Sequence, residues 1–217
     1  MTIVAYGIPG SPYLRQPLLA CEEKGVPWRV EALGMGEHKQ PDYLARQPFG
    51  RIPAVEHDGF RLYECQAILR YIDRAFDGPS LTPANARAAA RMDQVMNIMD
   101  WYVMPSLTSG IGFNRIVAPA FGMPVDEGAV KAAIPLAQTS LKALEDILGG
   151  QSYFGGDQVS LADLAAIAHL EMVPMSPEGA ELIAGSPLLA WLERMGQRPS
   201  VQKTNMLRMM GLEPAAA

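Results

Sequence analysis

The sequence has few cysteines and no long hydrophobic run. Its two cysteines, Cys21 and Cys65, form no Cys-x-x-Cys motif and are too few for a disulfide framework, so we expect reduced thiols that are not bonded to each other. No apolar stretch approaches the roughly 18 residues of a membrane-spanning helix, and the N-terminus lacks the basic and then apolar pattern of a signal peptide. We therefore expect a cytoplasmic protein with no membrane partner.

Positive charge is also scarce. The sequence has 18 Lys and Arg residues against 23 Asp and Glu residues, which gives a formal net charge of −5. Phosphate backbones are bound by clustered positive charge, and we therefore expect no nucleic-acid partner. Hydrophobic residues make up 49% and charged residues 19% of the 217 residues, a globular composition in a chain long enough for two domains.

Short strand and helix patterns alternate over residues 1–77. Strand patterns cover residues 2–6, 28–33, 53–57 and 60–64, and helical spacing covers residues 16–25 and 65–76. Asp58-Gly59 is a tight-turn dipeptide that joins the last two strands. The order β-α-β, a connection and then β-β-α predicts a small α/β domain.

No strand pattern follows Pro79. Residues 78–84 are predicted to be a linker, and helical patterns at 84–104, 126–148, 161–173 and 187–196 predict an all-helical domain over residues 85–217. The intervening residues 109–124 are predicted to form a loop. We expect its Phe113, Phe121 and Met123 to face a cleft or an interface, because leaving them in water is unfavourable.

One helix start in this half carries a strong signal. Ser160 is predicted to be an N-cap residue, and Asp163, three residues later, is predicted to bond back to it as in a capping box. Val159 and Leu164 are predicted to form a hydrophobic staple. This pattern is typical of a stabilising device, and we assign it no chemistry.

Ser11 lies where the first strand pattern ends and the first helical pattern begins. With Pro12 at the first helical position, it fits a simple N-cap whose hydroxyl bonds the helix backbone. The same position, past the carboxyl end of a strand and at the positive end of a helix, also suits an anionic ligand. Because Pro17 disfavours a regular helix, the sequence leaves open both the helix start and the role of the hydroxyl.

Two loop segments are also open to two interpretations. Ile52-Pro53 fits either an ordinary trans bond at a strand edge or a cis bond that leaves the Ile52 backbone free to pair with an extended peptide. His38 and Lys39 are either solvated loop residues or a site for a carboxylate.

Glu64 and Cys65 begin a helical pattern. Either Glu64 stabilises the N-terminus of its own helix, or it binds an amino group while the backbone amide of Cys65 holds a carboxylate. The second arrangement would suit the head of an amino acid.

The order of these features resembles the cytosolic glutathione transferases over essentially the whole chain. The likeness is greatest to the serine-type classes and, among them, to the phi class, as a bacterial-like member. Residues 6–28 and 36–72 look like the first βα unit and the glutathione-binding half of the domain, and residues 153–170 look like the family's capping-box helix. The resemblance implies a thioredoxin-like α/β N-terminal domain, an all-α C-terminal domain, a homodimer, and glutathione as co-substrate with no metal.

The resemblance also implies roles for individual residues. Ser11 matches the thiol-activating serine, and Tyr6 is the rival donor because other classes use a tyrosine at the end of the first strand. The expected glutathione-binding residues are His38, Lys39, Arg51, Ile52 before a cis Pro53, Glu64 and Cys65. The expected electrophile site comprises Ile8, Pro9, Pro12, Tyr13, Tyr102, Phe113 and Met123. Phe49 resembles the aromatic residue that inserts into the partner subunit.

The sequence departs from the family's pattern at three positions. Cys65 stands where serine is usual, Arg51 where glutamine is common and Pro17 where an aliphatic residue is found. These departures concern glutathione affinity and helix geometry more than the fold.

The implied function is activation of the glutathione thiol as a thiolate that attacks a hydrophobic electrophile, with a detoxification role. The alternative is a non-catalytic protein of the same fold that binds glutathione or apolar ligands. Serine rather than cysteine at position 11 argues against a thiol-disulfide reductase, because that chemistry needs a protein thiolate.

Overall fold

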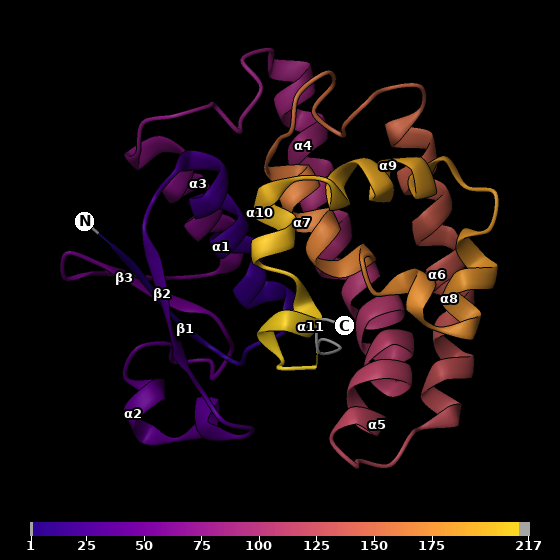
Figure 1. The fold of residues 1–217 in the computed structure, drawn as a ribbon, viewed down its shortest axis with the longest axis horizontal. Helices are drawn as coiled ribbons and strands as arrows, with labels where there is room; N and C mark the ends of the chain where they lie inside the picture. The colour runs from indigo at the N-terminus through magenta and orange to yellow at the C-terminus, as the bar shows by residue number, and fades with distance from the viewer. Residues whose placement is uncertain (1, 213–217) are drawn as a thin grey trace, which may run out of the picture. The chain divides into compact units, whose positions relative to one another are not determined.

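The computed structural model describes residues 2–212, which divide into two compact units (Figure 1). Of the described residues, 2–81 and 197–212 form one unit, and Thr82–Gly196 form the other. Residues 197–212 therefore group with the α/β unit, whereas the sequence pattern assigns them to the helical domain. No helix in the described part of the chain is long and apolar enough to cross a membrane.

A mixed four-stranded sheet forms the centre of the first unit. Its strands are β1 (Ile3–Gly7), β2 (Trp28–Ala32), β3 (Ala54–His57) and β4 (Phe60–Tyr63), in the order β2-β1-β3-β4. β1 is parallel to β2 and antiparallel to β3, and β3 is antiparallel to β4. The four predicted strands and the hairpin at Asp58-Gly59 are confirmed, as is the thioredoxin-like fold class.

Helices α1 (Pro12–Lys24) and α3 (Cys65–Ala75) pack against each other in this unit. The side chains of Ile3 and Ala5 alternate along β1 with half-buried ones, so that one face of the strand is buried. The core includes these two residues with Leu14, Leu18, Ile68, Leu69 and Ile72, all of which are fully buried. The short helices η1 (Glu37–Lys39) and α2 (Pro41–Leu44) lie in the connection between β2 and β3.

The second unit is all-helical, as predicted. Its helices are α4 (Ala86–Ile98), η2 (Met99–Val117), α5 (Ala118–Ala120), α6 (Glu127–Leu148), α7 (Leu161–Leu170), η3 (Val173–Met175), α8 (Pro177–Ile183) and α9 (Pro187–Gly196). The chain then returns to the first unit with α10 (Pro199–Lys203) and α11 (Met206–Met209).

The prediction of a loop at residues 109–124 is wrong for residues 109–120, because η2 continues as a π-helix to Val117 and α5 follows it directly. Gly110 and Gly112 lie in this segment, and both are buried at close helix contacts. A β-carbon on Gly110 would overlap that of Ala133 on α6, and one on Gly112 would lie 2.6 Å from Cε of Met172. The glycines therefore allow helices to approach and do not form a turn.

The capping box at the start of α7 is confirmed. Ser160 is the N-cap residue, and its backbone N–H and its hydroxyl each donate to Oδ2 of Asp163 at 2.9 Å. Because Asp163 is fully buried, this bond network lies inside the helical unit and has a structural role.

Candidate active site

The sheet register brings the predicted site segments to one end of the sheet. Gly7, the last residue of β1, pairs with Ala32 of β2, and Tyr6 pairs with Ala54, the first residue of β3. Ala54 in turn pairs with Tyr63, the last residue of β4. The loops that carry Ser11, His38 and Lys39, Ile52-Pro53 and Glu64 therefore all begin or end at the same end of the sheet.

Ser11 is the N-cap residue of α1, but its side chain makes no hydrogen bond to the helix. Its backbone N–H donates to the Ile8 carbonyl at 3.0 Å, and its carbonyl accepts the N–H of Arg15 at 3.0 Å. Within the described residues the hydroxyl has no hydrogen-bond partner, so the simple capping role is not what the structure shows. The half-buried hydroxyl is available to a ligand beside the positive end of α1.

The loop before β3 is held by residues that the sequence analysis missed. The peptide bond between Ile52 and Pro53 is cis. The hydroxyl of Tyr43 donates to the Arg51 carbonyl at 2.7 Å, and the backbone N–H of Arg51 donates to Oε1 of Gln47 at 3.0 Å. Burial raises the pKa of Tyr43 to about 12, which keeps this hydroxyl protonated as a donor.

No local pattern marks Tyr43 and Gln47, because each acts on a backbone group of Arg51 rather than through a recognisable motif. The backbone N–H and carbonyl of Ile52, by contrast, have no hydrogen-bond partner in the part of the chain that the structure describes. They are therefore open to an extended peptide ligand.

His38 and Lys39 adjoin this loop. The ammonium group of Lys39 donates to the Gly50 carbonyl at 2.6 Å, which uses one of its three donors. Nδ1 of His38 is buried and lacks a hydrogen-bond partner among the described residues. Burial, together with the positive charges of Lys39 and Arg51, holds the pKa of His38 below its usual value. A carboxylate placed here would meet two cationic side chains and one unsatisfied ring nitrogen.

Glu64 is the N-cap residue of α3 and, like Ser11, makes no side-chain hydrogen bond to its helix. Its backbone lies in a region that is unfavourable for a residue other than glycine, with φ of 71°. Its exposed carboxylate has no partner in the described chain. The interpretation in which Glu64 stabilises its own helix through its side chain therefore finds no hydrogen bond to support it.

The thiol of Cys65 points toward helix α1. Its single S–H is shared between two acceptors, Oε1 of Gln16 at 3.2 Å and the Tyr13 carbonyl at 3.5 Å from Sγ. The side chain of Cys65 thus has its partners inside the unit. Cys21 is fully buried, and burial raises the pKa of its thiol to about 12, so it is an unreactive core residue.

The remaining residues predicted for the site are exposed or half-buried. Tyr6 is half-buried, with the guanidinium group of Arg46 4.3 Å from its ring centroid. Phe49 is 67% exposed and packs edge-on against Tyr63. Of the expected electrophile-site residues, Ile8, Pro9, Pro12 and Tyr13 are half-buried in the first unit, and Tyr102, Phe113 and Met123 are exposed or half-buried in the second.

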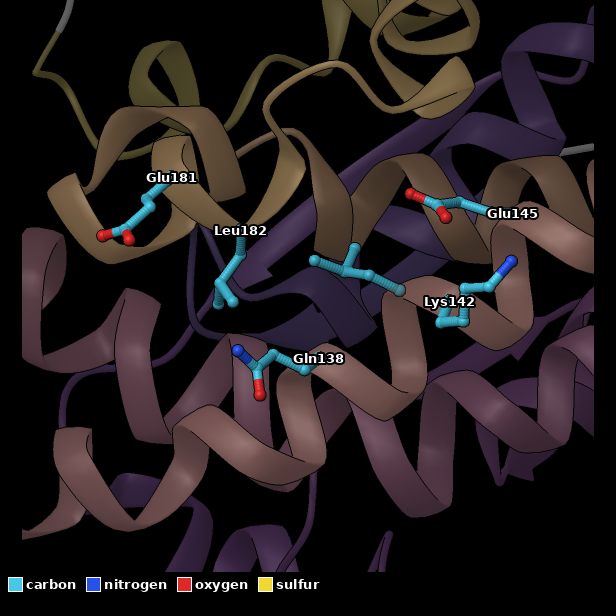
Figure 2. Close-up of a pocket in the computed structure, with 6 residues that line it drawn as sticks. Gln138, Lys142, Glu145, Glu181 and Leu182 are labelled. Carbon is cyan, nitrogen blue, oxygen red and sulfur yellow. The ribbon is translucent and has the colours of Figure 1, made fainter.

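A separate cavity lies in the helical unit between α6 and α8 (Figure 2). It has a volume of about 300 Å³ and is lined by Gln138, Leu141, Lys142, Glu145, Glu181 and Leu182. None of the predicted site residues contributes to it. No group of three or more His, Cys, Asp or Glu side chains that could hold a metal ion occurs in residues 2–212.

Comparison with known proteins gives matches along most of the chain. The models for the glutathione S-transferase N-terminal and C-terminal domains match residues 6–80 and 92–199. Glutathione S-transferase 3 of Zea mays is 31% identical over 204 residues, which are 92% of this chain and 91% of that protein.

Solved structures agree with these matches. The crystal structure of glutathione transferase F7 from Populus trichocarpa has a TM-score of 0.84 at 29% identity and covers 98% of this chain and 100% of its own. Glutathione S-transferase I from maize, in complex with an atrazine glutathione conjugate, has a TM-score of 0.81 at 28% identity, with 99% of each chain covered. These proteins come from plants, in agreement with the likeness to the phi class, and they give no support to a bacterial-like placement.

Proposed function

The chain belongs to the glutathione S-transferase family, and we propose that it uses Ser11 to activate the thiol of glutathione for attack on a hydrophobic electrophile. One observation carries this proposal: Ser11 occupies an N-cap position without using its hydroxyl as a cap. An N-cap serine normally bonds its own helix. Here the donor is free at a helix N-terminus, where negative charge is stabilised.

The chemistry requires a lower thiol pKa. A thiol with a pKa of about 8.5 is only a few per cent thiolate at about pH 7, and a decrease of about two pKa units corresponds to about 2.7 kcal/mol. One charge-assisted hydrogen bond contributes about 1.5–3 kcal/mol. The thiol proton leaves to solvent, and the Ser11 hydroxyl donates its hydrogen bond to the sulfur anion. The sulfur electron pair then forms the new bond to the electrophile. In a substitution the leaving group departs with the electron pair of its broken bond, and in an addition the electron pair of the broken π bond takes up a proton from solvent.

The rest of the tripeptide finds complementary groups at the same end of the sheet. Lys39 and Arg51 supply positive charge for the glycine carboxylate, and His38 offers an unsatisfied ring nitrogen beside them. The unpaired backbone of Ile52 is open to the cysteinyl group. The unpartnered carboxylate of Glu64 suits the γ-glutamyl amino group. We assign the γ-glutamyl carboxylate to the backbone amide of Cys65, because an amide at the start of α3 suits an anion.

The remaining parts of the proposal concern the whole enzyme. Residues 1–77 bind glutathione, the helical domain contributes Tyr102, Phe113 and Met123 to the electrophile site, and Ile8, Pro9, Pro12 and Tyr13 contribute from the first domain. The protein acts as a cytoplasmic homodimer in detoxification, with Phe49 at the dimer interface. Its exposed aromatic ring supports an interface at this position.

The test is the pKa of the glutathione thiol when bound, measured by ultraviolet thiolate absorbance against pH. Ser11→Ala and Tyr6→Phe form a matched pair, because each removes one hydroxyl from a candidate donor. We expect Ser11→Ala to raise the bound thiol pKa toward about 8.5 and to lower kcat/KM about a hundredfold, while Tyr6→Phe changes neither.

The opposite pattern would transfer the role to Tyr6. If glutathione saturates the parent protein but its thiol pKa stays at the free value, and a panel of electrophiles shows no turnover, the protein is a non-catalytic binder.

A further inference from the structure

The C-terminal segment, residues 197–212, belongs to the same unit as Ser11. Its helix α10 packs against α1, and Figure 1 shows the two side by side, α10 in yellow and α1 in indigo. The segment therefore lies along the helix whose N-terminus carries the proposed thiol donor.

Charged and polar bonds hold the segment on α1. The fully buried guanidinium group of Arg15 donates to Oγ1 of Thr204 and to the Val201 carbonyl, each at 3.4 Å. Further along α1, Glu23 accepts from Nε and Nη2 of Arg198 at 2.8 and 2.6 Å. Because breaking a buried charged contact leaves an uncompensated charge, these bonds fix where the end of the segment lies.

Met210 directly follows α11, and its side chain fills the space that a side chain at position 10 would take. Gly10 has φ of +84°, and a β-carbon at this position would overlap Cγ of Met210 and lie 2.7 Å from its Sδ. Gly10 is buried in this arrangement, although it lies in a loop. Position 10 thus needs glycine both for its left-handed backbone and for the room that the methionine takes.

The turn at residues 8–11 is restrained on two sides. Hydrogen bonds to Ile8 and Arg15 restrain the backbone of Ser11 from within the turn and the helix. Met210 covers the preceding residue, Gly10, whose permissive backbone would otherwise be the least restrained point of the turn.

From these contacts we infer that Met210 is a positioning residue for catalysis. It holds the Gly10-Ser11 turn so that the Ser11 hydroxyl stays oriented to donate a hydrogen bond to the glutathione sulfur. The inference rests on the proposed role of Ser11. Hydrogen bonds weaken steeply as their geometry departs from the optimum, and a displacement of about 1 Å can lower a rate by about a hundredfold. The C-terminal segment would thereby act in catalysis without touching substrate.

The experiment compares Met210→Ala with Met210→Leu, which restores an apolar side chain of similar volume, and with Met209→Ala at the neighbouring methionine. For each variant the bound thiol pKa, the pH profile of kcat/KM, the KM for glutathione and the thermal midpoint are measured, with 1-chloro-2,4-dinitrobenzene as electrophile. We expect Met210→Ala to raise the bound thiol pKa, to shift the pH profile in the same direction and to lower kcat about tenfold. The KM for glutathione should change less than about twofold, and the two other variants should resemble the parent.

A Met210→Ala protein with the parent's thiol pKa and pH profile overturns the inference, even if its thermal midpoint falls, because a purely structural role lowers stability without moving a pKa. Equal effects of Met209→Ala and Met210→Ala overturn it as well. Ser11→Ala is measured in parallel. If Ser11→Ala leaves the bound thiol pKa unchanged, the proposed function itself is wrong. If Ser11→Ala raises the bound thiol pKa and Met210→Ala does not, the proposed function stands and only the inference about Met210 is wrong.

Discussion

Asp163 is a fully buried carboxylate that joins three segments of the helical unit. Besides the two donors of Ser160, it accepts the backbone N–H of Phe154 at 2.9 Å and the indole N–H of Trp191 at 3.0 Å. Asp163→Ala leaves these donors buried without an acceptor. We expect it to lower the free energy of unfolding by about 3–5 kcal/mol, measured by urea denaturation.

Asp157→Ala is the matched control, since Asp157 is exposed in the loop that precedes α7. Its effect should stay within about 0.5 kcal/mol. Similar losses for both variants would contradict the structural importance assigned to the Asp163 network.

Residues at helix starts show what local sequence can predict. Ser160 and Asp163 are predicted together because both partners of the capping box lie three residues apart. The bonds of Asp163 to Phe154 and Trp191 are invisible to that pattern, because the partners lie in other segments. Ser11 and Glu64 are also predicted at helix starts, but sequence alone does not show whether such a side chain turns toward its own helix or away from it.

Helix α1 begins at Pro12, which settles the helix start that the sequence leaves open. Pro12 suits its first turn, and Pro17 is accommodated in its interior. In a regular helix the N–H of residue 17 would donate to the Tyr13 carbonyl, but proline has no N–H. The thiol of Cys65 lies 3.5 Å from that carbonyl oxygen. Two departures from the family's pattern, Pro17 and Cys65, are thus linked through one acceptor.

This link predicts that the stability cost of Cys65→Ala depends on the residue at position 17, which a double-mutant cycle measures. Cys65→Ala in the parent removes a donor from the Tyr13 carbonyl and should cost about 1–2 kcal/mol of unfolding free energy. In a Pro17→Leu background the helix supplies its own N–H, so the same Cys65→Ala change should cost less by about 0.5 kcal/mol or more. Equal costs in the two backgrounds would show that Cys65 and Pro17 act independently.

At the scale of the whole molecule, strand order and register decide which residues meet. The alternation of strand and helix patterns is sufficient to predict the α/β unit, its hairpin and the all-helical unit. The pairing of Tyr6 with Ala54 and of Ala54 with Tyr63 is not encoded in any short segment, so the convergence of the site loops followed from the family resemblance. The return of residues 197–212 to the first unit was not predicted, because helical periodicity does not specify which core a helix joins.

The proposed homodimer leads to a prediction about Phe49. Phe49 resembles the family's aromatic residue that inserts into the partner subunit, and its side chain is 67% exposed on the single subunit. A serine at this position keeps the loop polar and leaves the subunit core untouched. We expect Phe49→Ser to shift the protein from a dimer to the 23.5 kDa monomer, measured by light scattering over a dilution series.

Phe60→Ser provides the control, because Phe60 is a second exposed phenylalanine of the same unit, at 50% exposure, on the β3–β4 hairpin. This variant should keep the parent's mass and dissociation midpoint. If both variants remain dimeric at every concentration, Phe49 is not a principal contact of the interface. A monomeric parent would instead remove the homodimer, and the activity assays would then have to be interpreted for a subunit that acts alone.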